Sequence, residues 1–207
     1  MAYGRTISIW CFGTRSWNNE DGGGRVVKDP IEIVPYSPDW PERFRTIGSQ
    51  VRRALDAAAI RIDHIGSTAV PGLDAKPIID IQVSVASLEP IDAYRQRMIG
   101  IGYSWRSDNP DRTKRYFRES PEMDRTHIHM RVRGSWSEQF ALLFRDYLRN
   151  CPEEAGAYAA MKREQAQRFR LDRESYVEAK EPMIWDIMRR ASRWSQATGW
   201  APGESDI

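Results

Sequence analysis

The first clear pattern in the chain is helical, with apolar residues recurring every three or four positions. It begins after Asp39, a suitable N-cap, and Pro41 falls in the first turn, where the missing N–H of proline is tolerated. The residues of the apolar face are Phe44, Ile47, Val51 and Leu55. Their spacing predicts an amphipathic helix.

Alternation of apolar and polar residues follows this helix. Around Ile60–Asp63 it predicts a strand that runs into a turn at Gly66. A second strand is predicted over Ile78–Val85, where one face is apolar and Asp80 and Gln82 lie on the other. A loop rich in glycine and proline joins the two strands.

The rest of the chain divides into a mixed part and a helical part. A helix is expected from Pro90 to Gly100, followed by strands at 103–106, 114–118 and 126–132. From Ser135 onward the patterns are helical: Ser135-x-x-Glu138 resembles a capping box, and further helices are expected at about 152–169 and 173–196. This order predicts an α+β fold, in which helices flank a small mixed β-sheet and a helical C-terminal part follows.

The first 30 residues show no sustained periodicity and include the glycine run 22–24, which favours an extension outside the core. The short apolar run Ile7–Cys11 leaves an edge strand open as an alternative. We therefore expect three parts: an N-terminal extension at 1–30, an α/β core at 31–134, and a helical part at 135–196 that packs on the core.

Composition excludes several classes of protein. The chain has 207 residues, of which 41% are hydrophobic and 29% charged, as in ordinary globular proteins. With 31 basic and 29 acidic residues the formal charge is +2, so a nucleic-acid polymer is not the expected partner. Cys11 and Cys151 lie far apart, and no apolar stretch suits a signal peptide or a membrane span. We expect a cytoplasmic protein with no membrane partner.

The chain has three histidines, His64, His127 and His129, and each falls on a predicted strand beside charged residues. A lone histidine is usually structural or solvent-exposed. His127 and His129 are two positions apart, however, so both point to one face of their strand. Two imidazoles on one face indicate a face that binds a ligand or a metal ion.

The segment from His64 to Asp80 combines several groups that suit phosphate chemistry. Gly66 and Ser67 end a strand in a tight turn, where backbone N–H groups and hydroxyls can hold a phosphate, and Lys76 can add a positive charge. Asp80 projects from the next strand, where a carboxylate can hold a divalent cation against that phosphate. The alternative is a Gly-Pro hairpin with an exposed aspartate.

Several stretches resemble the GrpB family, also called UPF0157, and through it the nucleotidyltransferase superfamily. The resemblance covers about residues 31–185 and rests on Ile33–Trp40, His64-Ile-Gly-Ser-Thr-Ala-Val-Pro-Gly-Leu73, Lys76-Pro-Ile-Ile-Asp-Ile81, Thr126-His-Ile-His-Met130 and Leu143–Leu148. It implies a nucleotidyltransferase-like mixed sheet whose Gly-Ser turn binds nucleotide phosphates. It also implies an Asp-x-Asp/Glu pair that holds magnesium during nucleotidyl transfer.

This chain departs from that acidic pair, because it has Asp80-Ile-Gln82. Glutamine offers only a neutral carbonyl, which weakens a two-metal site. His129, or His127, can stand in for a third carboxylate and would suit manganese or zinc; alternatively, an imidazole acts as general base for the acceptor. We therefore expect catalysis by Asp80, His64, His127 and His129, and a metal ion held by Asp80, Gln82 and His129.

The expected phosphate-binding residues are Gly66, Ser67, Thr68, Lys76, Arg115 and Arg131. The two arginines are preferred to Arg118 and Arg125, because a fork of N–H donors on a rigid strand suits phosphate recognition. Two other sets of charges have plainer interpretations. Arg145 and Asp146 fit a structural ion pair under the sheet, and Lys162 and Lys180 fit a solvated helix face.

Three functions remain open from the sequence. The first is a metal-dependent nucleotidyltransferase. It would take ATP or another nucleoside triphosphate and transfer a nucleotidyl group to a small-molecule acceptor, or activate that acceptor. The group expected first is adenylyl. The divalent ion would be magnesium, manganese or zinc. The second is a non-catalytic nucleotide- or ligand-binding module, as Gln82 permits; GrpB-like domains are similar to the partner fused to dephospho-CoA kinase in some proteins. The third is a hydrolase with Asp80 and three histidines around one ion.

Overall fold

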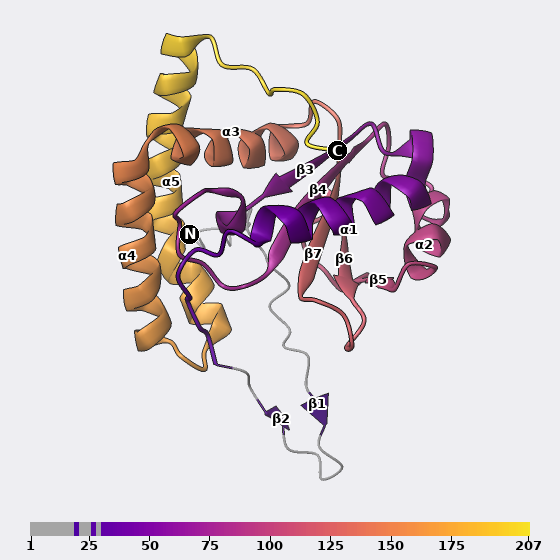
Figure 1. Cartoon of the computed structure of the whole chain (residues 1–207), viewed down its shortest axis with the longest axis horizontal. Coiled ribbons are helices and arrows are strands. Elements are labelled where there is room, and N and C mark those ends of the chain that lie inside the picture. Colours follow the sequence, from indigo (N-terminus) through magenta and orange to yellow (C-terminus); the bar gives the residue numbers. More distant parts are fainter. Residues whose placement is uncertain (1–18, 21–25, 28–29) are drawn as a thin grey trace, which may run out of the picture.

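The fold is built on a five-stranded mixed sheet, seen here in a computed structural model that describes residues 19–20, 26–27 and 30–207. The strands lie in the order β3-β4-β7-β6-β5 (Figure 1). Their bounds are Arg61–Ile65 for β3, Ile79–Val85 for β4, Tyr103–Trp105 for β5, Lys114–Glu119 for β6 and Thr126–Val132 for β7. In this sheet β4 and β7 pair in parallel, and the other pairs are antiparallel.

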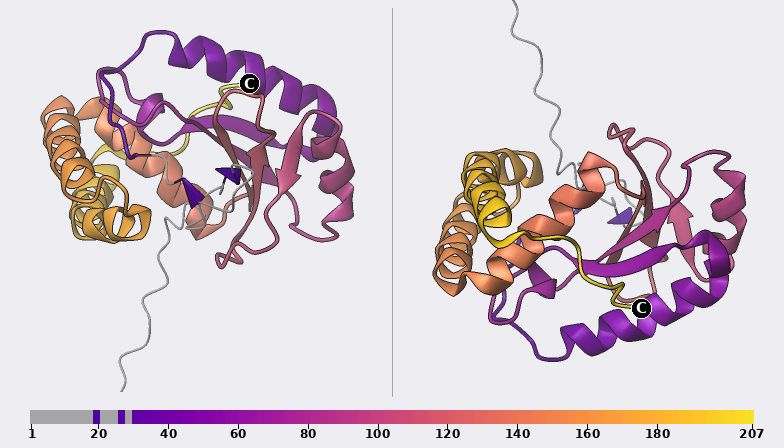
Figure 2. Two further views of the ribbon diagram at one scale, coloured as in Figure 1. Left: turned by 90° about the horizontal axis from the view of Figure 1, so that it is seen from below. Right: turned by 90° about the horizontal axis from the view of Figure 1, so that it is seen from above.

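Helices pack on the sheet and continue beside it. Helices α1 (Trp40–Leu55) and α2 (Asp92–Ile99) cover one face, whereas α3 (Trp136–Asn150), α4 (Pro152–Arg168) and α5 (Arg173–Thr198) form the helical C-terminal part (Figures 1 and 2). The short helical turns η1 (Asp56–Ala58) and η2 (Ser67–Ala69) flank β3, and β1 (Asn19–Glu20) pairs with β2 (Val26–Val27). The expected α+β class, with a small mixed sheet and a helical C-terminal part, is confirmed.

The two faces of the sheet differ in chemistry, as the alternation in β4 predicts. Its apolar residues face α1 and α2 in a core with Trp40, Phe44, Leu55 and Met98, and removal of such surfaces from water is the main force that stabilises a fold. Its polar residues face the other way. In the parallel pair of β4 and β7, Asp80 lies beside His127 and Gln82 lies beside His129. The predicted set of polar residues therefore shares one face of two neighbouring strands.

A second core fastens the loop between β3 and β4 to the helical part. Val70 and Leu73 of this loop are buried among Phe144, Tyr158 and Ile184 of the three C-terminal helices. The loop is also tied to the N-terminal side of the core, because the backbones of residues 34 and 75 hydrogen-bond each other at 2.9 and 3.0 Å. These contacts hold the Gly-Ser turn at a fixed position between sheet and helices.

The element boundaries lie within a few residues of those expected, with two informative differences. The helix expected to open at Pro90 begins at Asp92. The capping box is half formed: the Ser135 hydroxyl accepts from the Glu138 N–H, but the Glu138 carboxylate accepts from Ser84 and Gly134.

Most of the predicted extension at 1–30, including the candidate edge strand Ile7–Cys11, lies outside the described residues. Among the helices that the structure describes, none combines the length and the apolar character needed to cross a bilayer.

The C-terminal segment lies along the free edge of β3. The Ile62 N–H donates to the Ser205 hydroxyl at 2.7 Å, the Ile207 N–H donates to the Ile62 carbonyl, and the His64 N–H donates to the Asp206 carboxylate at 2.9 Å. The same carboxylate accepts from the buried guanidinium of Arg145 at 3.0 Å. Residues 205–207 therefore satisfy backbone groups of β3 that point away from the sheet.

Replacing Asp206 tests this edge. In Asp206→Ala the buried His64 N–H loses its acceptor and Arg145 loses one of its anions, so we expect the free energy of unfolding to fall by about 1–2 kcal/mol. Urea denaturation measures the loss. Glu204→Ala is the matched control, because the exposed Glu204 contributes only its backbone carbonyl, to Arg61. Equal denaturation midpoints for the two variants would contradict the assignment.

Candidate active and metal-binding site

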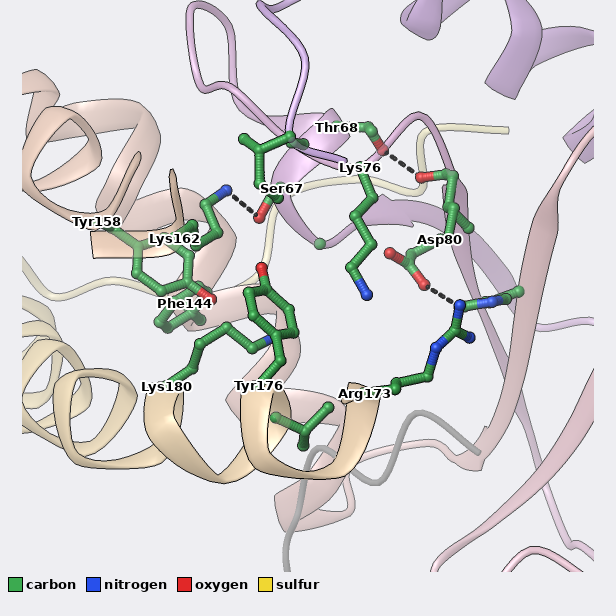
Figure 3. Close-up of a pocket in the computed structure, with 16 residues that line it drawn as sticks. Ser67, Thr68, Lys76, Asp80, Phe144, Tyr158, Lys162, Arg173, Tyr176 and Lys180 are labelled. Carbon is green, nitrogen blue, oxygen red and sulfur yellow. Dashed lines mark hydrogen bonds and ion pairs between the residues drawn. The ribbon is translucent and has the colours of Figure 1, made fainter. Parts of the chain in front are cut away.

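A pocket opens where the loop after β3, the polar face of the sheet and the helical part meet (Figure 3). The loop contributes Gly66, Ser67, Thr68 and Lys76, and the strands contribute Asp80 and His127. The helices contribute Phe144, Tyr158, Lys162, Arg173, Tyr176 and Lys180. The structure thus brings together the Gly-Ser turn, Asp80 and His127, as the sequence predicts, and adds residues from three helices.

Gly66 allows the turn to approach Asp80 closely. Its φ of 72° lies in a region that side chains disfavour, and an added Cβ would lie 2.7 Å from the Asp80 Oδ2 atom. The next residue, Ser67, turns its hydroxyl toward the helical part, where it accepts a hydrogen bond from the Lys162 ammonium at 2.9 Å (Figure 3). Glycine at position 66 is therefore required by both conformation and space.

His64 supports the turn from the opposite face of the sheet. Its ring stacks on Phe44, with centroids 4.7 Å apart, and its Nε2 atom lies 3.0 Å from the Thr68 hydroxyl. Because Thr68 donates its single hydroxyl hydrogen to the Ile78 carbonyl, it accepts from a protonated Nε2. Burial lowers the pKa of His64 to about 3, so the ring is neutral at neutral pH. The sequence grouped His64 with the other two histidines, but the structure does not bring it to them.

Asp80, His127 and His129 form a compact group on the polar face, with one ligand atom from each within 4.8 Å of the others. The Asp80 Oδ1 atom lies 3.1 Å from His127 Nδ1 and 3.5 Å from His129 Nε2. Two donors bound to one tetrahedral ion at about 2.0–2.1 Å lie roughly 3.3 Å apart, so these spacings fit a shared metal ion. The Tyr116 ring packs against both imidazoles, with centroids 5.5 and 5.2 Å away.

The protonation states of this group also suit a cation. Burial raises the pKa of Asp80, but hydrogen bonds from His127 and His129 outweigh it and hold that pKa below its usual range. Burial lowers the pKa of His127, and it lowers the pKa of His129 to about 3. At neutral pH the group is therefore an ionised carboxylate beside two neutral imidazoles, the forms in which these side chains bind metals.

Gln82, the third expected ligand, is engaged elsewhere. Its amide nitrogen donates to the Glu138 carbonyl at 3.4 Å, and its amide oxygen accepts from Arg131 at 3.0 Å. His127 takes the corresponding place in the group with Asp80. Because His64 lies on the other face, the arrangement of three histidines around one ion that a hydrolase would need is not formed.

The pocket gathers basic side chains beside the group of Asp80, His127 and His129. Lys76 and Lys180 both lie over the Tyr176 ring, at 4.7 and 4.5 Å from its centroid, and Arg173 projects from the start of α5 (Figure 3). Burial, aided by Lys180 and Arg173, lowers the pKa of Lys76 to about 6. Burial also lowers the pKa of Lys180 to about 8, and that of Lys162 well below its usual value. Such crowding of basic side chains suits a polyanionic ligand.

For two of these lysines the environment differs from the one expected from the sequence. Lys162 and Lys180 were expected on a solvated helix face, but their exposed fractions are 3% and 7%. The sequence did carry a signal: Lys162 lies four residues after Tyr158, and Lys180 lies four residues after Tyr176, so each interrupts an apolar stripe. A lysine in such a position is either paired or functional.

The expected phosphate-binding arginines do not line this pocket. Arg115 points to the other face of β6 and pairs with Glu89. Arg131 shares the polar face but is buried against Gln82 and the Ser137 carbonyl, and burial lowers its pKa to about 10. Arg145 and Asp146 form the expected ion pair, at 2.7 Å.

Comparisons with known proteins match most of the chain. A family described as "GrpB protein" matches residues 30–190. A "UPF0157 protein" of Pseudomonas aeruginosa is 38% identical over 187 residues, which cover 87% of this chain and 73% of that protein. A dephospho-CoA kinase of Mycolicibacterium paratuberculosis is 34% identical over 203 residues, which cover 86% of this chain. The chain spans only about half the length of that kinase, 50%.

One solved structure is similar over most of this chain. The crystal structure of the conserved protein GrpB from Enterococcus faecalis has a TM-score of 0.72 at 31% identity, and the match covers 79% of this chain and 99% of that one. A cytoplasmic RNA terminal U-transferase resembles the chain distantly, with a TM-score of 0.47 at 13% identity, over 65% of this chain and 41% of that one.

The contact between Gly66 and Asp80 predicts a specific stability difference. In Gly66→Ala the new Cβ meets both an unfavourable φ and the Asp80 carboxylate, whereas in Gly72→Ala it meets a similar φ of 75° and nothing within 4 Å. We expect the first variant to be less stable than the second by about 1–3 kcal/mol, because only the first is overpacked. Thermal and urea unfolding measure this difference. A Gly66 variant as stable as the Gly72 control would refute the close approach.

The pKa of His64 predicts how stability depends on pH. This pKa is about 3 in the folded chain and about 6.5 in an unfolded one, so the unfolded chain binds more protons between these values. The stability contributed by neutral His64 is complete above about pH 6.5 and decreases as the pH falls. Between about pH 7 and pH 5 the loss from this residue should be roughly 2 kcal/mol.

The matched variant is His64→Gln, because a glutamine amide can still donate to Thr68 but does not titrate. We expect its unfolding free energy to fall less steeply than that of the wild type over this range, in urea titrations at several pH values. Parallel curves for the two proteins would exclude a buried neutral His64.

Proposed function

This chain belongs to the GrpB family, and from that premise we propose that its pocket binds a nucleoside triphosphate with a divalent metal ion and transfers the nucleotidyl group to a small-molecule acceptor. One observation carries the proposal. Lys76, Lys162, Lys180 and Arg173 converge on a pocket in which, among the described lining residues, Asp80 is the one acidic side chain. Such a set of basic side chains around one pocket suits a ligand with several negative charges.

The Gly-Ser turn and the helical lysines are suited to the phosphate chain. Gly66 leaves the backbone open beside Asp80, and the Ser67 hydroxyl already contacts Lys162, so a phosphate oxygen can share both partners. Lys180 approaches from another helix, over the Tyr176 ring. The ligand would therefore bridge the sheet and the helical part.

The metal would be held by Asp80, His127 and His129. Mixed nitrogen and oxygen donors favour manganese or zinc over magnesium, which prefers oxygen ligands. A bound ion would supply Lewis-acid stabilisation of the charge that develops on the transferred phosphoryl group. In this proposal Arg173 projects from the start of α5 and balances part of the remaining phosphate charge.

A second candidate is a binding module of the same fold without transfer chemistry. The specific observation in its favour is Gln82, which stands where the nucleotidyltransferase superfamily is expected to have a second carboxylate. Its amide is hydrogen-bonded to Arg131 and Glu138. The half-length match to a dephospho-CoA kinase is compatible with a module attached to another activity. Both candidates require nucleotide and metal binding, and only the first requires release of pyrophosphate.

Asp80→Asn tests the proposal. The amide keeps the shape of the carboxylate but removes its charge, so we expect the affinity for ATP in the presence of manganese to fall by roughly tenfold or more. Calorimetry measures this affinity, and thermal unfolding verifies that the variant folds. Asp186→Asn, at an exposed position on α5, is the matched control and should bind as the wild type does.

Failure of the wild type to bind any nucleoside triphosphate with manganese, zinc or magnesium would refute the proposal. Pyrophosphate release, assayed with a panel of amine, alcohol and carboxylic acid acceptors, separates the two candidates. Tight binding with no release from any acceptor would favour the binding module.

A further inference from the structure

We propose that the Lys76 amine is the first acceptor of the nucleotidyl group, so that transfer proceeds through a covalent lysyl–nucleotide intermediate. This inference rests on the proposed function, because it names a residue that would react within the same pocket. It follows from the position of Lys76, from the hydrogen bonds that hold the neighbouring Lys162, and from the presence of a single carboxylate in the proposed metal-binding group.

The backbone and side chain of Lys76 are both well positioned for this role. The preceding residue, Ala75, is fixed by its two hydrogen bonds to Val34. The side chain extends from there into the pocket, between Tyr176 and Asp80 (Figure 3). Its Nζ atom lies 4.7 Å from the centre of the Tyr176 ring, which gives the amine an apolar wall on one side.

Lys76 differs from Lys162 in what its amine contacts. The Lys162 amine is held in place by two hydrogen bonds, which it donates to the Ser67 hydroxyl and to the Asp74 carbonyl. Within the part of the chain that the structure describes, no hydrogen bond or ion pair holds the Lys76 amine, which lies over the Tyr176 ring. Burial and the nearby cations Lys180 and Arg173 lower its pKa, which leaves a lone pair available at neutral pH.

Asp80 is the one carboxylate of the proposed metal-binding group, and this gives a reason for transfer through Lys76. A second carboxylate would hold a second ion, which helps to deprotonate an incoming hydroxyl. Here Gln82 stands in that place and is bonded to Arg131 and Glu138. A neutral amine attacks phosphorus without prior deprotonation, so Lys76 can begin the transfer with one ion at Asp80.

The first step balances as a substitution at the α-phosphorus of ATP. The Lys76 nitrogen forms a bond to this phosphorus, and the bond from phosphorus to the oxygen bridging the α- and β-phosphates breaks. One amine proton leaves with the departing pyrophosphate, so that the nitrogen is uncharged and the phosphoramidate keeps one negative charge on its phosphoryl oxygens. In the second step an acceptor oxygen or nitrogen attacks the same phosphorus, the N–P bond breaks, and Lys76 regains a proton from the acceptor.

Exchange of labelled pyrophosphate into ATP, without any acceptor, tests the intermediate. A covalent route makes the first step reversible by itself, whereas direct transfer allows no exchange until an acceptor is present. We expect exchange by the wild-type chain with manganese, and a mass increase of one adenylyl group that is labile in acid and stable in base. Peptide mapping should locate it on Lys76.

Lys76→Arg should lose exchange and adduct by roughly a hundredfold or more, because a guanidinium is a poor nucleophile. Lys28→Arg is the matched control: residue 28 precedes the family match, which begins at residue 30, so the variant should retain both signals. Thermal unfolding of each variant verifies that it folds.

The outcomes separate this proposal from the one on which it rests. If calorimetry on the same samples detects ATP binding but the wild type gives neither exchange nor adduct, the Lys76 intermediate is wrong and the nucleotide site stands. Exchange that survives in Lys76→Arg, or an adduct on another residue, also overturns it. If ATP does not bind at all, the proposed function fails as well.

Discussion

The geometry of this site depends on the close approach of the Gly66 backbone to the Asp80 carboxylate. A side chain at position 66 would occupy the space of the Asp80 oxygen, so the turn and the carboxylate can lie together only because residue 66 has none. This approach fixes Ser67 opposite Lys162 and holds Asp80 against His127. The Gly-Ser turn and the pair of Asp80 and His127 thereby line one pocket.

The buried polar residues around this pocket lower the stability of the fold. Burying lysines and histidines has a desolvation cost that apolar residues of the same volume would avoid. Part of it is offset by ordinary means, such as the contact of Lys162 with Ser67 and of His127 with Asp80. The remaining desolvation cost is reflected in the lowered pKa values of Lys76 and Lys180. The apolar core between the other face of the sheet and helices α1 and α2 supplies the stability that offsets this cost.

Periodicity predicted the elements well because local patterns determine them, but it could not decide which distant residues meet. A two-residue period places His127 and His129 together from the sequence alone. The face on which His64 lies depends on its pairing with Ile81 across β3 and β4, a register that local spacing does not contain. Arg115 does not line the pocket for the same reason, since its neighbours Lys114 and Tyr116 occupy the polar face. Lys162 and Lys180 were detectable as interruptions of apolar stripes, yet only the packing of α4 and α5 brings them to the Gly-Ser turn.

The C-terminal segment has a consequence for how this molecule meets other molecules. β3 is the outermost strand on its side of the sheet, and such a strand normally offers a row of unpaired N–H and C=O groups to any extended chain nearby. Residues 205–207 and Arg145 satisfy the outward groups of residues 62 and 64, so this row is not available. A short tail with almost no regular structure therefore acts as protection against intermolecular β-pairing, and fusions or truncations that displace it would create an aggregation-prone edge.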